Sequence, residues 1–420
     1  MADWKQVIRD EWNRRHRADA PQSFFPLISQ SFDDREIIAT VDALLSGRLT
    51  LDEQVRSFER RFAEIVGAKY AVMVNSGSSA NLLALAAAAN PARKRRLQPG
   101  DEVLIPAVCW STSLWPIVQM GLKPVFVDSS PETLNMDVDD LRRKITAKTR
   151  AVMAVHILGN AAPMAEVVKL VGEHGLLLIE DTCESLGSRF RDRHLGTLGD
   201  FGSYSFYYSH HITTGEGGMV VCGALEDYDL LKCLRAHGWS RELSNREQVE
   251  EANPQIDPRF LFVNAGYNLR PLEVQAAFGH CQLDRLAGMN EVRNENRVRM
   301  ISALQAHPKW QGQLQFPVAS ADVEPVWFGF VALLDQKIAE HYGRYLRHLS
   351  ARGVENRPVV SGNFTRQPAI RLLGIRCDPR AFPGAEEIGR RGFFAGLHTE
   401  PLSAEKIERV ADIMLEHDFA

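Results

Sequence analysis

The stretch that decides the fold is residues 151–180, which read AVMAVHILGNAAPMAEVVKLVGEHGLLLIE. Two continuous apolar runs, 151–156 and 176–180, enclose a segment with helical spacing at 163–174. Apolar runs of this length are typical of strands buried on both faces, and two such strands joined by a helix lie parallel in one sheet. The stretch therefore predicts a strand–helix–strand unit inside an α/β domain.

The same alternation continues on both sides of this unit. Further strands are expected at 71–74, 103–105, 124–128, 203–206 and 219–222, with helices at 79–89 and 111–121. Repeated alternation of strands and helices is the pattern of a mostly parallel central sheet flanked by helices. We therefore predict an α/β fold for a large domain that covers residues 31–288.

Past residue 285 the pattern changes. A charged helix is expected at 289–306, where it can bridge two domains, followed by a strand at 326–334 and helices at 338–352 and 403–417. Residues 378–385, with two prolines and a glycine, are interpreted as a loop. Together these elements predict a smaller C-terminal α+β domain, residues 289–420.

The first 30 residues are expected to form an N-terminal helix and an arm. Trp4, Ile8 and Trp12 recur every four residues, which indicates an amphipathic helix that packs on the body or on a partner subunit. This segment is charged throughout and lacks the apolar core of a signal peptide.

Composition narrows the range of functions. The 420 residues include 49 Lys+Arg and 53 Asp+Glu, a net charge of -4 that argues against nucleic acid or an anionic membrane as the main partner. No apolar run is long enough to span a bilayer. The six cysteines are scattered, without the spacing of a zinc or iron–sulfur site, so we expect no metal and a reduced, cytoplasmic protein.

Two motifs suggest a binding site at the ends of strands. The turn NSGSSAN, residues 75–81, follows a strand and opens a helix, where backbone N–H groups and hydroxyls can cradle a phosphate. The segment EDTCE, residues 180–184, ends a strand, and Asp181 can hold a pyridinium nitrogen protonated. Both motifs also have a plain interpretation as helix caps. Trp110 can stack on a flat ring or belong to the core.

A third and a fourth motif follow. Residues 205–218, SFYYSHHITTGEGG, place His210 and His211 between two strands, and adjacent histidines without further ligands do not favour a metal site. Residues 266–275, GYNLRPLEVQ, carry Asn268 and Arg270, which can bind phosphate or carboxylate. Taken singly, Arg270 is better interpreted as a surface salt bridge.

In this order the motifs resemble the sugar-nucleotide aminotransferase family of fold-type-I pyridoxal-phosphate (PLP) enzymes. The matching elements also include Ser46-Gly47, Pro106 to Trp110, the segment 124–128, and Arg357-Pro358 followed by Gly362. The similarity runs from about residue 25 to the end of the chain. It implies a fold-type-I PLP-dependent transferase that acts on a nucleotide sugar, in the cytoplasm, as a homodimer with shared active sites.

The resemblance implies a role for each matching residue. It assigns Ser78, Ser79 and Ser205 to the cofactor phosphate, together with Asn268 from the neighbouring subunit. It places Trp110 against the cofactor ring and pairs Asp181 with the ring nitrogen. Glu184 stands beside the ring where the family usually has Gln or His. Arg270 and Arg357 are expected to bind substrate, Arg270 as a partner for the carboxylate of a glutamate donor. Asp52 departs from the glycine that is more common there, so the local sugar contacts are left open.

The main departure is His210, because the family's aminotransferases have a lysine there that bonds covalently to the cofactor. Imidazole cannot form that bond but can move protons near neutral pH. Within the family, histidine marks the sugar 3-dehydratases, which serve dideoxysugar biosynthesis such as that of lipopolysaccharide O-antigen. One kind of dehydratase carries an iron–sulfur cluster. The other has no cluster and uses glutamate, which suits the scattered cysteines here.

The resemblance therefore implies C3-deoxygenation of an NDP-4-keto-6-deoxyhexose by pyridoxamine phosphate (PMP), with glutamate regenerating PMP from PLP. His210 is the expected acid–base, and His237 is a second active-site residue by similarity of residues 233–239. Two alternatives stay open. One is a nucleotide-sugar 4-aminotransferase or another PMP-dependent sugar-modifying enzyme, and the other is a non-catalytic sugar-binding family member.

Overall fold

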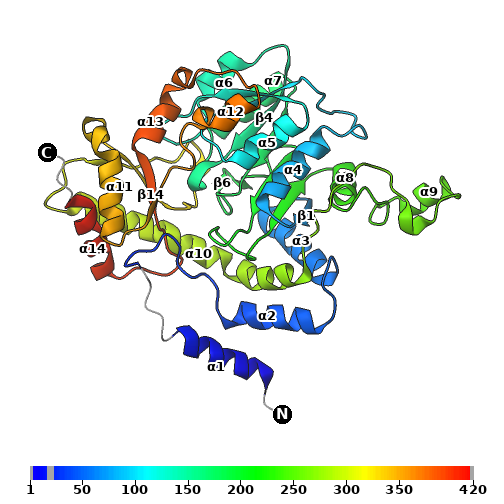
Figure 1. Ribbon diagram of the computed structural model, residues 1–420, viewed down its shortest axis with the longest axis horizontal. Coiled ribbons are helices and arrows are strands. Elements are labelled where there is room, and N and C mark those ends of the chain that lie inside the picture. The colour runs from blue at the N-terminus through cyan, green and yellow to red at the C-terminus, as the bar shows by residue number, and fades with distance from the viewer. Residues whose placement is uncertain (1–2, 17–22, 417–420) are drawn as a thin grey trace.

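A seven-stranded sheet forms the centre of the large domain (Figure 1), in the order β1-β9-β8-β5-β4-β2-β3. The computed structural model describes residues 3–16 and 23–416. The strands are β1 (Tyr70–Val74), β2 (Glu102–Pro106), β3 (Lys123–Val127), β4 (Thr149–Val155), β5 (Leu177–Asp181), β8 (Phe201–Ser205) and β9 (Gly218–Cys222). Strand β9 runs antiparallel to β1 and β8, and the other pairs are parallel. The predicted mostly parallel sheet is confirmed.

The bounds of the seven predicted strands lie within two residues of the observed ones, because both faces of the sheet are covered. In β1, Val72 and Val74 belong to the apolar cluster that includes α4, whereas Ala71 and Met73 pack with side chains of α3 and α10. Successive side chains of a strand point to opposite faces, so a strand between two helix layers is apolar throughout.

Helices surround this sheet. They are α2 (Asp34–Leu45), α3 (Glu53–Val66), α4 (Gly77–Ala88), α5 (Ser111–Gln119), α6 (Val138–Lys144), α7 (Met164–Glu173), α8 (Leu225–Arg235), α9 (Arg246–Glu251) and α10 (Glu273–Ala306). In Figure 1, α8 and α9 extend away from the body on the side opposite the small domain. Asp52 precedes α3 without capping it; the carboxylate of Glu273 accepts the N–H groups of Asp52, Gln54 and Val55 instead.

The small domain is built on a second sheet, in the order β10-β12-β14-β13. Its strands are β10 (Leu314–Gln315), β12 (Phe330–Leu334), β13 (Asn356–Pro358) and β14 (Gly392–Ala395), with helices α11 (Tyr342–Ala351), α12 (Pro368–Leu372), α13 (Pro383–Arg391) and α14 (Ala404–Leu415). A third sheet, β11-β6-β7, joins Val323–Glu324 to Arg189–Phe190 and Arg193–His194.

Four predictions in this domain need correction. The strand expected at 326–334 begins only at Phe330, and the helix expected at 338–352 starts as a 3-10 turn, Gln336–His341, before α11. The loop expected at 378–385 is wrong, because Pro383 begins α13; proline at the first helical position costs no hydrogen bond. The last helix, expected to reach His417, ends at Leu415, and His417 lies outside the described residues.

The described N-terminal residues form a helix and an extended arm. Helix α1 (Trp4–His16) contacts α2, and the Trp12 ring lies 5.6 Å from that of Phe32. The following arm runs between the small domain and α10: Phe25 N donates to Gly353 O, and Gln282 Nε2 donates to Ser31 O. The arm therefore closes one side of the space between the domains.

Helix α10 is a single 34-residue helix, about 50 Å long, that passes from the large domain into the small one (Figure 1). The helix predicted at 289–306 is its second half. The domain limit that the sequence suggests, 288/289, falls inside it. Among residues 3–16 and 23–416, no helix is long and apolar enough to cross a membrane.

Candidate functional site

Three segments meet in a tight turn at the ends of β1, β8 and β9. Ser76 caps α4, and its Oγ accepts the N–H of Ser79 at 3.1 Å. A Cβ on Gly77 would lie 2.5 Å from Ser205 Cβ, and a Cβ on Gly218 would lie 2.4 Å from Ser76 O. Only glycine permits this approach. A helix N-terminus ringed by serine hydroxyls is a site suited to a phosphate group.

The outer rim of this turn carries the next two predicted residues. Ser78 Oγ donates to Thr112 Oγ1 at 3.1 Å, which ties the start of α4 to the start of α5. Trp110 immediately precedes α5 and is 57% exposed, so its ring face is open to stacking. The interpretation of Trp110 as a core residue, which the sequence left open, is therefore wrong.

Asp181 lies deeper, at the end of β5, and is 4% exposed. Its Oδ2 accepts from Asn81 Nδ2 and from Ser113 Oγ, both at 2.7 Å, and its Oδ1 accepts from Cys183 N at 3.1 Å. All three donors are neutral, and within the described part of the chain Asp181 forms no ion pair. A buried carboxylate needs a counter-charge. The protonated nitrogen of a pyridine ring suits this position, so the residues present fit a PLP-type cofactor.

Sequence reasoning missed the two side chains that hold this carboxylate. Asn81 belongs to the phosphate motif but received no role, and its Oδ1 also accepts from Ser203 Oγ at 2.6 Å. Ser113 is buried in the first turn of α5. Small polar residues at helix starts look like caps in a sequence, so only the fold reveals that both aim at Asp181.

Glu184 lies close to Asp181. Its Oε2 accepts from Leu158 N at 2.9 Å, and desolvation, aided by the charge of Asp181, raises its pKa to about 7. A carboxyl group with this pKa is about half protonated at neutral pH. Glu184 can therefore donate a hydrogen bond, as a glutamine amide in the same place would.

His210 lies in the loop between β8 and β9. Its imidazole contacts the rings of Phe328, at 5.2 Å between centroids, and Tyr207, at 5.9 Å. Its Nδ1 is buried and has no hydrogen-bond partner among the described residues. Burial lowers the pKa of His210 to about 4; the charge of Asp181 opposes this shift and that of Arg293 adds to it. The imidazole is therefore neutral at pH 7, with a nitrogen free to take a proton.

The adjacent His211 has a different environment. It is fully buried, its Nε2 lies 3.0 Å from Val326 O, and burial lowers its pKa well below the usual value. The two rings both contact Phe328, but of their two Nδ1/Nε2 pairs only His211 Nε2 has a hydrogen-bond partner among the described residues. Across the residues with described positions, no group of three or more His, Cys, Asp or Glu side chains is arranged to hold a metal ion.

The remaining predicted residues gather elsewhere. His237, in a left-handed backbone conformation with φ +63°, lies 4.9 Å from Trp239 between ring centroids. Asn268 is exposed, and its Oδ1 accepts from Arg270 Nε at 3.1 Å. Leu269 O accepts from Asn75 N, which fixes the segment 268–270 beside the turn that opens α4.

Arg357 is exposed on β13, and its Nη1 donates to the carbonyl of Asn356. The structure thus brings together Ser79, Ser205, Asp181, Glu184 and His210, with Ser78 and Trp110 on the rim. It leaves Arg357 outside that assembly, and likewise His237, Asn268 and Arg270.

Comparison with known proteins identifies a family and several similar enzymes. The model of the DegT/DnrJ/EryC1/StrS aminotransferase family matches residues 30–415. The chain is 38% identical over 376 residues to GDP-4-keto-6-deoxy-D-mannose 3-dehydratase of Escherichia coli, covering 89% of this chain and 95% of that protein.

Two solved structures are similar throughout. One is GDP-4-keto-6-deoxymannose-3-dehydratase with a trapped PLP–glutamate geminal diamine, with a TM-score of 0.86 at 37% identity over 93% of this chain and 100% of that one. The other is a variant of that enzyme with bound GDP-perosamine, with a TM-score of 0.86 at 36% identity and the same coverage. The predicted fold class is confirmed, and the chain belongs to the DegT/DnrJ/EryC1/StrS aminotransferase family.

Proposed function

We propose that the protein is a PLP/PMP-dependent sugar-nucleotide 3-dehydratase, which converts an NDP-4-keto-6-deoxyhexose into a 4-keto-3,6-dideoxy sugar. The observation that carries this proposal is His210, a neutral imidazole with an unpartnered Nδ1 in a loop that bears a covalently bonded lysine in the family's aminotransferases. The high similarity to enzymes named as 3-dehydratases supports it.

When bound, PMP supplies an amine that reacts with the C4 keto group and a ring that withdraws electrons. Asp181 holds the positive charge of the ring nitrogen, and the N-terminus of α4 with Ser79 and Ser205 holds the phosphate. Glu184 can donate a hydrogen bond beside the ring. These residues fix the cofactor without a covalent bond to the chain.

His210 moves the proton. Its neutral Nδ1 can accept a proton beside the reacting carbon. With a pKa of about 4, the imidazolium is a stronger acid than an ordinary imidazolium and gives the proton up more readily, and the oxygen of the leaving C3 hydroxyl is the natural recipient. One side chain thereby acts as base and then as acid.

We propose glutamate as the amino donor and a homodimer as the working unit. Asn268 points to solvent beside the phosphate turn, and exposed apolar side chains flank it at Phe262, Val263 and Leu272. Apolar patches of this kind mark protein interfaces, and Asn268 can then reach the phosphate site of the second subunit. We place the enzyme in the cytoplasm, since all six cysteines are free.

The test is the mass of the product. Purified protein loaded with PMP is incubated with glutamate and each of GDP-, CDP- and dTDP-4-keto-6-deoxyhexose. We expect a product with one oxygen fewer than the substrate. A 4-amino sugar that keeps its C3 hydroxyl would refute the proposal in favour of a 4-aminotransferase.

Two substitutions refine the assignment. His210→Asn removes the acid–base and should slow dehydration by roughly 10²–10⁴-fold, whereas His210→Lys should favour transamination. The matched control is His174→Asn, a histidine exposed at the end of α7. This control should leave the rate unchanged.

A further inference from the structure

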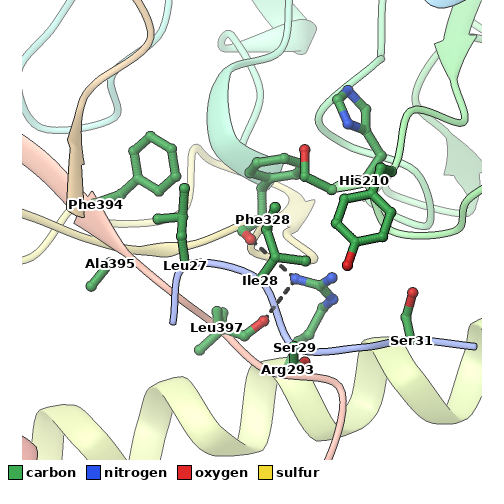
Figure 2. Close-up of a pocket in the computed structure, with 12 residues that line it drawn as sticks. Leu27, Ile28, Ser29, Ser31, His210, Arg293, Phe328, Phe394, Ala395 and Leu397 are labelled. Carbon is green, nitrogen blue, oxygen red and sulfur yellow. Dashed lines mark hydrogen bonds between the residues drawn. The ribbon is translucent and has the colours of Figure 1, made fainter. Parts of the chain in front are cut away.

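A small cavity lies beneath the His210 loop, between the N-terminal arm and the small domain (Figure 2). Its volume is about 60 Å³. The lining combines apolar side chains with a few polar ones, Leu27, Ile28, Ser29, Ser31, Tyr208, Ser209, His210, Arg293, Phe328, Phe394, Ala395 and Leu397. His210 thus borders both this cavity and the surroundings of Asp181.

The cation of this cavity is Arg293, which rises from α10 and is 6% exposed. Its Nη1 donates to two backbone carbonyls, Phe328 O at 3.1 Å and Leu397 O at 2.9 Å (Figure 2). Its Nε is buried without a partner, and neither Nε nor Nη2 has a hydrogen bond to any described residue. These two nitrogens form the edge of a guanidinium that binds a carboxylate with two parallel hydrogen bonds.

The charge of Arg293 is also unbalanced. Within residues 3–16 and 23–416, no carboxylate forms an ion pair with it, and burial lowers its pKa to about 10. The positive charge of Arg293 acts on three histidines, His210, His211 and His398. The pKa of each is lowered by burial, and the charge of Arg293 adds to this shift. Buried cations are ordinarily paired. An anion in the cavity would supply the missing partner.

We propose that Arg293 binds the side-chain carboxylate of the amino donor, an α-amino dicarboxylic acid. This inference rests on the proposed function, since it names the donor subsite of that same reaction. A donor seated there has its carboxylate on the Nε/Nη2 edge and its methylene groups against Leu27, Ile28 and Phe394. Its amino-bearing carbon then faces His210.

The size and the charge of the cavity favour this occupant. One water needs roughly 10–15 Å³ of such space, so about 60 Å³ admits a carboxylate and its neighbouring methylenes. A nucleoside diphosphate is much larger, and its two or more negative charges exceed the single cation present. The apolar half of the lining suits a short hydrocarbon chain.

The half-reaction in which this donor takes part balances without a further reactant. The donor's C–N bond breaks and its α-carbon is oxidised to a keto group. A new C–N bond forms at the cofactor's aldehyde carbon, which is reduced to an amine. The aldehyde oxygen leaves as water, and one water supplies the keto oxygen of the 2-oxo acid.

Two half-reactions, measured separately, test the proposal. The donor half-reaction is followed as the absorbance change of PLP-loaded protein with glutamate or with alanine, which lacks the second carboxylate. The sugar half-reaction is a single turnover of PMP-loaded protein. For Arg293→Met we expect the KM for glutamate to rise on the order of 10- to 100-fold. The rate of the sugar turnover should change much less, because there Arg293 acts only through its effect on the pKa of His210.

Arg297→Met is the matched control. Arg297 lies one turn further along α10, is desolvated as well, and donates to Pro317 O while facing a different hollow. Its substitution should leave the preference for glutamate over alanine intact. If Arg293→Met does not fold, as judged by its melting temperature, Arg293→Lys decides; it keeps the charge and loses the fork, so glutamate KM should rise several-fold.

Glutarate supplies a readout that does not depend on catalysis. We expect it to raise the melting temperature of the cofactor-free wild type and of Arg297→Met, but not of Arg293→Met. Equal shifts in all three proteins, or an equal response to acetate, would overturn the proposal. If the wild type fails to deoxygenate any sugar while glutarate binding still depends on Arg293, the proposed function falls and the carboxylate site stands.

Discussion

Gly218 lies so close to the turn before α4 that its substitution by alanine should weaken cofactor binding. A Cβ added at Gly218 would lie 2.4 Å from Ser76 O and 2.8 Å from Gly77 N, where ordinary contacts begin at about 3.4 Å. In Gly218→Ala the turn must therefore retreat by about 1 Å, because both nearest atoms belong to the backbone and neither has a rotamer to change.

This displacement acts on the phosphate site directly. A shift of about 1 Å breaks hydrogen bonds of 2.7–3.2 Å, and a hydrogen bond to a charged group contributes about 1.5–3 kcal/mol. Loss of one such bond corresponds to a rise of about 10- to 100-fold in the Kd for PLP, since each 1.4 kcal/mol is tenfold. The assay is a titration of cofactor-free protein with PLP, followed by absorbance.

Gly223→Ala is the control, because it follows the other end of β9 and nothing lies within 4 Å of its added Cβ. It should bind PLP like the wild type. Melting temperatures of the cofactor-free variants separate a local effect from general unfolding. A Gly218→Ala protein that is folded and binds PLP within about twofold of the wild type would refute the phosphate assignment.

Three further outcomes are expected. Asn81→Ala removes one donor from the buried Asp181 carboxylate, so calorimetry should show a Tm lower by about 2–3 °C; an unchanged Tm would contradict the network. The pKa values of His210 and His398 in the folded protein, both about 4, lie below the usual 6.5, so the unfolded chain takes up protons first as the pH is lowered. Between pH 6.5 and 4 the free energy of unfolding should therefore fall by about 1.4 kcal/mol per pH unit for each group. Denaturant titrations that show no such pH dependence would argue against the burial of the two side chains. Arg235→Met leaves the buried carboxylate of Glu59 without its cation, so the free energy of unfolding should fall by about 3–5 kcal/mol. Thermal unfolding should show this loss as a clear drop in Tm. A melting curve identical to that of the wild type would disprove it.

The large domain was largely predictable because its strands are buried on both faces. Continuous apolar runs such as 151–156 leave no ambiguity about burial, and the helices between them keep the runs apart. The small domain was less predictable. Strand β14 (Gly392–Ala395) is only four residues long, and α13 begins with proline, which the sequence pattern associates with loops.

The candidate site divides in the same way. Residues on motifs at strand ends, such as Asp181 and His210, could be named from the sequence because the fold fixes where strand ends lie. Arg293 could not, since it is one of many charged residues along α10 and nothing in the sequence says which of them faces the interior. Its burial depends on the arm and on β14, which lie hundreds of positions apart in the chain.

The unbroken course of α10 has a consequence for how this enzyme can be altered by recombination. A crossover at the apparent domain limit, 288/289, would cut through an intact helix a few residues before Arg293. A chimaera joined there would combine the first half of one parent's helix with the second half of another's, and with it two mismatched halves of the donor cavity. A crossover outside Glu273–Ala306 keeps the helix in one piece, but the cavity lining runs from Leu27 to Leu397, so specificity should be exchanged intact only when that whole range comes from one parent.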